Sequence, residues 1–270
     1  MGDPSPSGRS GRLSASAITT TRIPAGNATR PLATLQTIPA ASLPPAFLPP
    51  IRALHAACFR EDAADMATAP DAAFLERLAW LHEPAECVWV LCWGGAGPGG
   101  EGMAIDGAPP PAAPPPSSSL PPLLAMVTAV PYPASFFGFN LAVAPAWRGL
   151  GLGRRVMHEM QAAGLARFGL AAISATVDAA GAPALVRYYC GFGGVVEATG
   201  VSGPGAPPPP TVRVVRRFDE RGLVADTAAA DEALLARVRR RSAVRRWVRT
   251  GLVVGVGAVV VAGWRRRGGA

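Results

Sequence analysis

Lysine is absent from the 270-residue sequence, so arginine supplies all 26 basic residues, against 18 acidic ones. The net charge of +8 is concentrated near the C-terminal end. Aromatic residues make up only 7% of the chain, and no platform of stacking side chains is interleaved with the arginines, which argues against nucleic acid as a partner. The charge predicts an anionic membrane surface instead. The clustered residues are Arg237, Arg239, Arg240, Arg241, Arg245, Arg246 and Arg249, followed by Arg265, Arg266 and Arg267.

Cysteine is scarce, with four residues, and no two of them form a Cys-x-x-Cys pair. A disulfide framework is therefore not expected in a chain of this length. His55 and Cys58, together with His82 and Cys87, match no strong zinc spacing. The sequence predicts no metal site.

Residues 139–153 combine an apolar strand, a proline-marked exit and a glycine-spaced turn, and an amphipathic helix follows directly. The first turn of a helix offers unpaired N–H groups and the positive end of the helix dipole. Gly151 and Gly153 carry no side chain, so a diphosphate can approach the backbone there. A dinucleotide-binding motif is the competing interpretation, but it requires Gly-x-Gly-x-x-Gly, and the spacing here is Arg-x-x-Gly-x-Gly. The segment therefore predicts a site for a different phosphorylated ligand.

The run from Arg148 to Gly153 resembles the Arg/Gln-x-x-Gly-x-Gly/Ala signature of the GNAT superfamily of acetyl-CoA-dependent N-acetyltransferases. The run from Ala184 to Gly193 resembles the second signature of that family, Ala-x-x-x-Tyr-x-x-x-Gly-Phe. The two stand in the family's order, and we expect the resemblance to extend over residues 31–219.

The resemblance implies that acetyl-CoA is the acyl donor. It gives the main-chain N–H of Val143 the role of oxyanion donor and Tyr188 the role of general acid. Tyr189 stands four residues before Gly193, so a shift of one residue would exchange the two tyrosines. The implied cofactor-binding residues are Leu141, Ala142 and Val143 for the pantetheine arm, and Arg148, Gly149, Leu150, Gly151, Leu152, Gly153 and Arg154 for the diphosphate.

No acidic residue lies between Asp106 and Glu159, so the strand that carries a glutamate base in many family members offers only Asn140 here. The remaining candidate bases are Glu61, Glu76 and Asp178. The two signatures favour an N-acetyltransferase that acts on a primary amine, namely a small molecule, a peptide N-terminus or a lysine. The missing acid favours the alternative, a non-catalytic acyl-CoA-binding or scaffold protein at a membrane.

The order of predicted elements is that of an α+β fold with αβα layers, in which helices flank a mixed, mostly antiparallel sheet. On the motif helix we expect Leu152, Val156, Met160 and Ala163 to be buried, and Arg155 and Glu159 to form an exposed i,i+4 pair. Strands are expected at 32–38, 86–93, 123–130, 135–143, 171–177, 194–201 and 211–218, and helices at 47–59, 72–82, 183–190 and 226–250, besides the motif helix. The Gly/Pro/Ser-rich residues 94–122 are expected to form an extended insertion.

Both ends of the chain carry separate predictions. Residues 1–30 are either a disordered segment or an organelle transit peptide, which would direct the chain to a chloroplast or mitochondrion. Residues 220–249 are expected to form a basic juxtamembrane helix. Residues 250–264 are expected to form a short transmembrane helix of about 22 Å, bracketed by arginines that reach toward the interfaces. The soluble alternative is a buried strand or core helix.

Overall fold

The computed structural model describes residues 18–24, 31–59, 63–79, 82–83, 86–95, 120–132, 134–178, 182–198 and 211–267, with side chains in the last of these segments described as far as Val244. The predicted insertion at 94–122 lies outside these residues except at its two ends.

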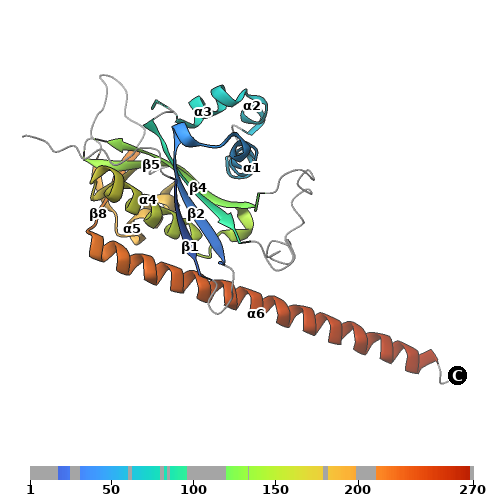
Figure 1. The fold of residues 1–270 in the computed structure, drawn as a ribbon. Helices are drawn as coiled ribbons and strands as arrows, with labels where there is room; N and C mark the ends of the chain where they lie inside the picture. Colours follow the sequence, from blue (N-terminus) through green and yellow to red (C-terminus); the bar gives the residue numbers. More distant parts are fainter. Residues whose placement is uncertain are drawn as a thin grey trace, which may run out of the picture.

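Within these residues the centre of the molecule is one eight-stranded sheet with the order β1-β2-β3-β4-β5-β6-β8-β7 (Figure 1). Every neighbouring pair is antiparallel except β5 and β6. The predicted mixed, mostly antiparallel sheet is therefore confirmed. The strands are β1 (Thr19–Ile23), β2 (Ala33–Pro39), β3 (Val88–Gly94), β4 (Leu123–Tyr132), β5 (Ser135–Val143), β6 (Ala172–Asp178), β7 (Val195–Ala198) and β8 (Thr211–Arg217).

Helices cover both faces of the sheet (Figure 1). One hydrophobic cluster joins the sheet to α1 and α3, and a second joins the other face of the sheet to α4 and α6. Both faces are buried because apolar residues occupy successive positions of the central strands, as β3 shows over its whole length. The helices are α1 (Leu48–Cys58), α2 (Ala63–Thr68), α3 (Asp71–Ala79), α4 (Leu152–Phe168), α5 (Pro183–Gly191) and α6 (Glu220–Arg267).

Residues 19–23 form β1 and pair with β2, so the prediction of a disordered segment is wrong for this part of residues 1–30. A hydrogen bond holds this strand against α4, because the Thr21 hydroxyl donates to the Glu159 carboxylate at 2.8 Å. The rest of residues 1–30 lies outside the described structure except for the positions flanking this strand.

Helix α6 is one continuous helix where the sequence predicted two segments. It starts beside β8, crosses the sheet on the α4 side and extends away from the domain (Figure 1). Among the residues whose side chains are described, no helix is long and apolar enough to cross a membrane. The predicted transmembrane residues 250–264 have helical backbone, but their side chains lie outside the described part.

Candidate active site

The predicted diphosphate turn connects β5 to α4. After β5, a short 3-10 helix, η5 (Pro145–Trp147), leads into the turn. Trp147, Leu150 and Leu152 are all buried in the core, so they anchor the turn from inside. The intervening glycines are left at the surface or half-buried, where the backbone is accessible to a ligand.

Two glycines of this turn adopt a left-handed backbone, which explains the residue type. Gly149 has φ +76° and Gly151, the N-cap of α4, has φ +99°. A side chain at either position would strain the backbone. No side chain caps the helix, so the first N–H groups of α4 remain available to an anion.

Gly153 is required for space. A Cβ at this position would lie 3.3 Å both from the Tyr188 hydroxyl oxygen and from a Val143 methyl carbon, which is tight for either contact. The missing side chain therefore allows α4, the end of β5 and α5 to meet at one point. The structure brings together the two residues predicted to be catalytic, Tyr188 and Val143, beside the predicted phosphate turn.

The backbone N–H of Val143 points to the side of β5 where no neighbouring strand is paired at this position. Ala144 N–H donates to Leu124 O on β4 at 2.8 Å. Alternate residues of a strand point their N–H groups to opposite edges, so the Val143 N–H points away from β4. On that side β5 pairs with β6 only at Phe136 and Phe137, and the two strands are unpaired beyond that point. The Val143 N–H thus faces the opening between them, as an oxyanion donor must.

A bulge in β5 precedes this opening. The register between β4 and β5 shifts between Met126 and Thr128, and Asn140 has φ +54°. The Asn140 side chain is held by donating to Leu78 O of α3 at 2.6 Å. Asn140 is therefore a structural anchor in this arrangement and supplies no base.

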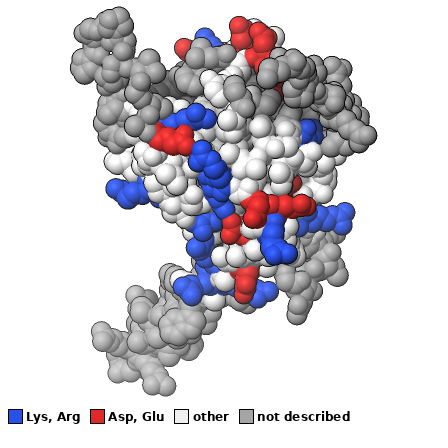
Figure 2. All heavy atoms as spheres, turned by 90° about the vertical axis from the view of Figure 1, so that its left-hand side faces the viewer, with Lys and Arg blue, Asp and Glu red and all other residues white. Residues whose placement is uncertain are grey.

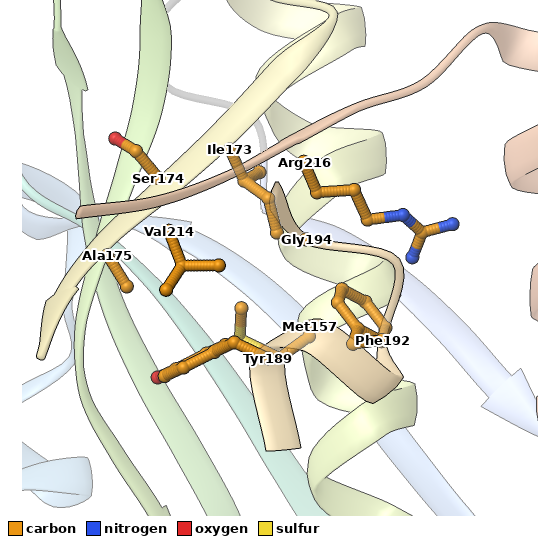
Figure 3. A pocket seen from close by; sticks show the side chains of 9 residues that line it. All are labelled: Met157, Ile173, Ser174, Ala175, Tyr189, Phe192, Gly194, Val214 and Arg216. Atoms are coloured by element: carbon orange, nitrogen blue, oxygen red, sulfur yellow. The ribbon is translucent and has the colours of Figure 1, made fainter. Parts of the chain in front are cut away.

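The two candidate acids differ in their surroundings. The Tyr188 hydroxyl is buried and has no hydrogen-bond partner among the described residues, and burial raises its pKa. Tyr189 packs against the core, and burial raises its pKa as well. Tyr188 is the tyrosine beside Val143 and Gly153, whereas Tyr189 lines a pocket between α4, α5 and the β6–β8 region (Figure 3).

That pocket is separate from the predicted cofactor residues. Its lining is mostly apolar, with Arg216 extending past Phe192 at one side (Figure 3). None of the predicted acetyl-CoA residues contributes to it. The lining residues are Met157, Ile173, Ser174, Ala175, Tyr189, Phe192, Gly194, Val214 and Arg216.

The predicted arginines at the turn make inward contacts. Arg148 Nε donates to Val143 O at 3.0 Å, and Arg148 Nη2 lies 3.4 Å from Cys58 Sγ. Arg154 Nη2 donates to Gly191 O at 2.9 Å. Arg148 thus braces the end of β5, and Arg154 connects α4 to the end of α5.

Two further arginines, which the sequence pattern did not predict, contact the turn. Arg237 Nη1 lies 3.4 Å from Leu150 O, and Arg241 Nη1 donates to Ala146 O at 2.7 Å. Both come from α6, 87 and 95 residues away in sequence. The only signal in the sequence was their i,i+4 spacing within a segment that we assigned to a membrane surface.

Of the three candidate general bases, the described part of the structure includes only the side chain of Glu76. Glu76 is an exposed residue of α3. Glu61 and the side chain of Asp178 lie outside the described part of the structure. Within the described residues, no group of three or more His, Cys, Asp or Glu side chains is arranged to hold a metal ion.

Comparison with known proteins identifies a family over the centre of the site. Residues 122–192 match the Acetyltransferase (GNAT) family. This segment includes β4, β5, the turn, α4, β6 and α5, and it confirms the predicted family resemblance. No curated protein sequence matches the chain significantly.

Solved structures with a similar fold include three proteins of low sequence identity. An acyl-CoA N-acyltransferase from Pseudomonas aeruginosa is 15% identical, with 68% of this chain and 99% of that chain covered and a TM-score of 0.42. The Escherichia coli protein ElaA is 13% identical, with 68% and 98% covered and a TM-score of 0.42. Spermidine N-acetyltransferase from Vibrio cholerae, in complex with CoA and spermine, is 16% identical, with 72% and 98% covered and a TM-score of 0.43.

Proposed function

We propose, from the match of residues 122–192 to the GNAT acetyltransferase family, that the chain is an acetyl-CoA-dependent N-acetyltransferase in which acetyl passes directly from the thioester to a neutral primary amine. The observation that carries the proposal is the meeting of Tyr188, Val143 and Gly153 at the start of α4. Residues on the turn and at the end of β5 would hold acetyl-CoA there, with its diphosphate on the free N–H groups of α4.

In the proposed reaction the amine nitrogen attacks the thioester carbon. The carbonyl oxygen becomes an oxyanion and accepts a hydrogen bond from the Val143 N–H. The C–S bond then breaks, and the leaving sulfur takes a proton from Tyr188. The amine loses one proton to a base, directly or through water, so that an amide and a free thiol result.

Burial of Tyr188 supports its part in this reaction. Its pKa is raised mainly by burial, with a smaller effect of Tyr189, so the phenol stays protonated at neutral pH. A protonated phenol is the form that donates to the leaving sulfur. The unpaired hydroxyl also has no competing acceptor among the described residues.

Release of CoA thiol from acetyl-CoA in the presence of a panel of amines tests the proposal. Direct transfer gives initial-rate lines that intersect when both substrates are varied, whereas a covalent acyl-enzyme gives parallel lines. Acetyl-CoA binding without thiol release for any primary amine would favour the non-catalytic alternative, a scaffold or acyl-CoA-binding protein.

We further propose that residues 250–264 attach the enzyme to a membrane. The support is the uncharged run Gly251–Trp264 between arginines, and the helical backbone of α6 that leads into it. A helix over 250–264 is about 22 Å long, shorter than the ~30 Å apolar core of a bilayer. The flanking Arg249 and Arg265 can extend toward the interfaces and make up the difference.

A further inference from the structure

Helix α6 places two guanidinium groups against the turn that the family signature assigns to the diphosphate. Arg241 Nη1 donates to Ala146 O at 2.7 Å, and Arg237 Nη1 lies 3.4 Å from Leu150 O. A Cβ at Gly151 would lie only 2.6 Å from Arg237 Nη1, so this guanidinium lies directly on the glycine turn. We propose that Arg237 binds the diphosphate of acetyl-CoA, an inference that rests on the proposed function.

Arg237 has the free hydrogen-bonding capacity that such a ligand requires. A guanidinium carries five N–H donors, and the described contact at 3.4 Å uses one of them weakly. Among the described ion pairs, none involves Arg237, and the residue is exposed. A planar guanidinium also matches the geometry of phosphate oxygens and can bind two of them at once.

The two arginines inside the signature, Arg148 and Arg154, point to other groups than the diphosphate. Arg148 is turned toward Val143 O and Cys58 Sγ, and Arg154 is turned toward Gly191 O. The N–H groups of the turn supply hydrogen bonds but only a partial positive charge. A full counter-charge beside them strengthens the binding of a diphosphate, and Arg237 is placed to supply it.

Packing of α6 fixes the position of Arg237. Leu234 and Val238 are buried in the same hydrophobic cluster as Val156 of α4. Arg237 and Arg241, one helical turn apart, therefore both face the turn. Arg241 has the stronger bond to the backbone and acts as a brace, whereas Arg237 remains available to the ligand.

Calorimetric titration of the full chain with acetyl-CoA tests the assignment. The matched control is Arg239→Gln, because Arg239 is exposed on the same helix, about 160–200° around it from Arg237 and Arg241. Arg237→Gln is expected to weaken binding about tenfold to a hundredfold, the range for a hydrogen bond to a charged group. Arg239→Gln measures the general loss of positive charge and is expected to stay within about twofold at physiological salt. Arg237→Lys should recover part of the affinity, because the charge is kept and the fork is lost.

A second ligand separates the phosphates of the cofactor. With acetyl-CoA that lacks the 3′-phosphate, the same penalty for Arg237→Gln supports contact with the diphosphate. A penalty that disappears with this ligand overturns the assignment in favour of the 3′-phosphate. Equal affinities of the Arg237→Gln and Arg239→Gln variants overturn the role of Arg237, while failure of the wild type to bind acetyl-CoA overturns the proposed function itself.

Discussion

At the scale of single residues, the two adjacent tyrosines are distinguished by what they touch. Only Tyr188 has its hydroxyl beside Val143 and Gly153. Tyr188→Phe should lower kcat by about 10²-fold or more, the usual contribution of a positioned acid, with little change in acetyl-CoA affinity. Steady-state kinetics and titration check this. If Tyr189→Phe loses the activity and Tyr188→Phe keeps it, the acid is Tyr189.

His158 on α4 should make the free energy of unfolding depend on pH. Its pKa is lowered to about 4, first by burial and then by Arg216 of β8, with Arg155 and Arg154 adding smaller effects against Asp226 of α6. The folded state therefore binds a proton less readily than the unfolded chain, in which the pKa is about 6.5. The contribution of His158 to the free energy of unfolding is therefore fully present above pH 6.5 and is lost as the pH falls toward 4.

His158→Gln tests this dependence by urea unfolding at two pH values. Between pH 7 and pH 5 the free energy of unfolding of the wild type should fall by about 2 kcal/mol because of His158, and that of the variant should lack this decrease. His82→Gln is the control, since His82 lies elsewhere, beside Phe137 and Phe139. The same loss in all three proteins would assign the effect to other groups.

Residue patterns in the sequence predicted one face of α4 and missed the other. Leu152, Val156 and Met160 are buried as expected, because periodicity identifies the face toward the sheet. The predicted i,i+4 pair of Arg155 and Glu159 forms, but its predicted exposure is wrong, since both residues are buried. Their cover comes from β1 and α6, elements remote in sequence that no local pattern could place there.

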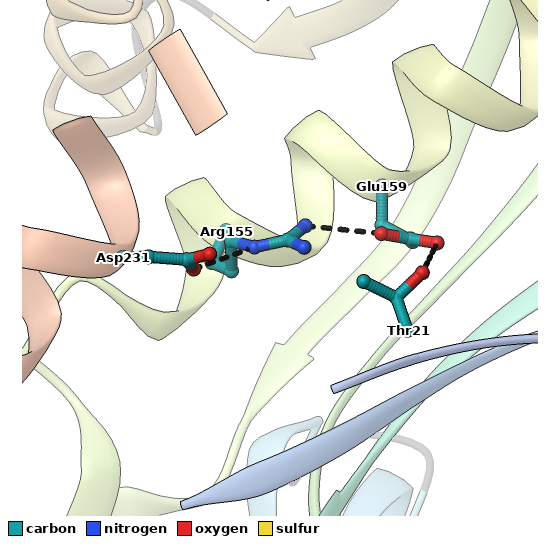
Figure 4. Close-up of polar contacts among 4 residues, drawn as sticks. All are labelled: Thr21, Arg155, Glu159 and Asp231. Atoms are coloured by element: carbon teal, nitrogen blue, oxygen red, sulfur yellow. Dashed lines mark hydrogen bonds and ion pairs between the residues drawn. The ribbon is translucent and has the colours of Figure 1, made fainter. Parts of the chain in front are cut away.

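At the scale of elements, α4 and α6 are joined by a buried polar cluster. Arg155 Nε donates to Asp231 of α6 at 2.7 Å, and its Nη1 donates to Glu159 at 3.1 Å (Figure 4). Glu159 in turn accepts from Thr21 of β1 (Figure 4). One arginine thus compensates two carboxylates and connects both chain-terminal elements to the motif helix.

Removal of that arginine should be costly. Arg155→Met leaves Glu159 and Asp231 without their counter-charge and should lower the free energy of unfolding by about 3–5 kcal/mol. The control is Asp71→Asn, which breaks the Arg52–Asp71 pair at the surface and should cost at most about 1 kcal/mol. Denaturant unfolding measures both. Equal effects would mean that the cluster at Arg155 contributes no more than a surface pair.

Most sheet strands and most helices could be predicted, and the exceptions share a physical cause. β3 and β5 follow largely apolar runs, β2 mixes apolar and polar residues, and α1 begins within one residue of its predicted start. β1 has the polar sequence Thr-Thr-Thr-Arg-Ile and lies at the sheet edge, and α2 has six residues, too few for a clear period. In the site, the glycine turn has a local signature, whereas the Arg237 contact depends on how α6 packs.

At the scale of the whole molecule, charge is distributed unevenly. On the face in Figure 2, basic and acidic side chains are intermixed near the lower end of the described surface. Arg216 pairs with Asp226, and Arg217 pairs with Glu197 at 3.2 Å, so part of the positive charge is already compensated within the domain. Arg237 and Arg241 contact the turn, so these two arginines are also engaged within the domain.

Washing of membranes separates insertion from surface binding of the full chain. The basic segment should contribute ~1 kcal/mol per arginine close to an anionic surface, and salt screens this attraction. An inserted helix should resist both high salt and carbonate, and truncation at Arg249 should release the protein. Release of the full chain by salt alone would reduce the tail to a peripheral basic helix, and solubility at low salt would contradict membrane attachment.

The continuity of α6 also fixes the distance between the active-site turn and the proposed membrane anchor. Residue 250 lies nine positions after Arg241, which is about 14 Å of straight helix. In an anchored enzyme the acetyl donor would then sit just outside the headgroup layer, at the end of a helix that runs without a break from the domain into the anchor. Acceptors would have to present their amines within that shallow zone, so lipid headgroups and the juxtamembrane amines of other proteins would meet the thioester far more often than amines in bulk solution.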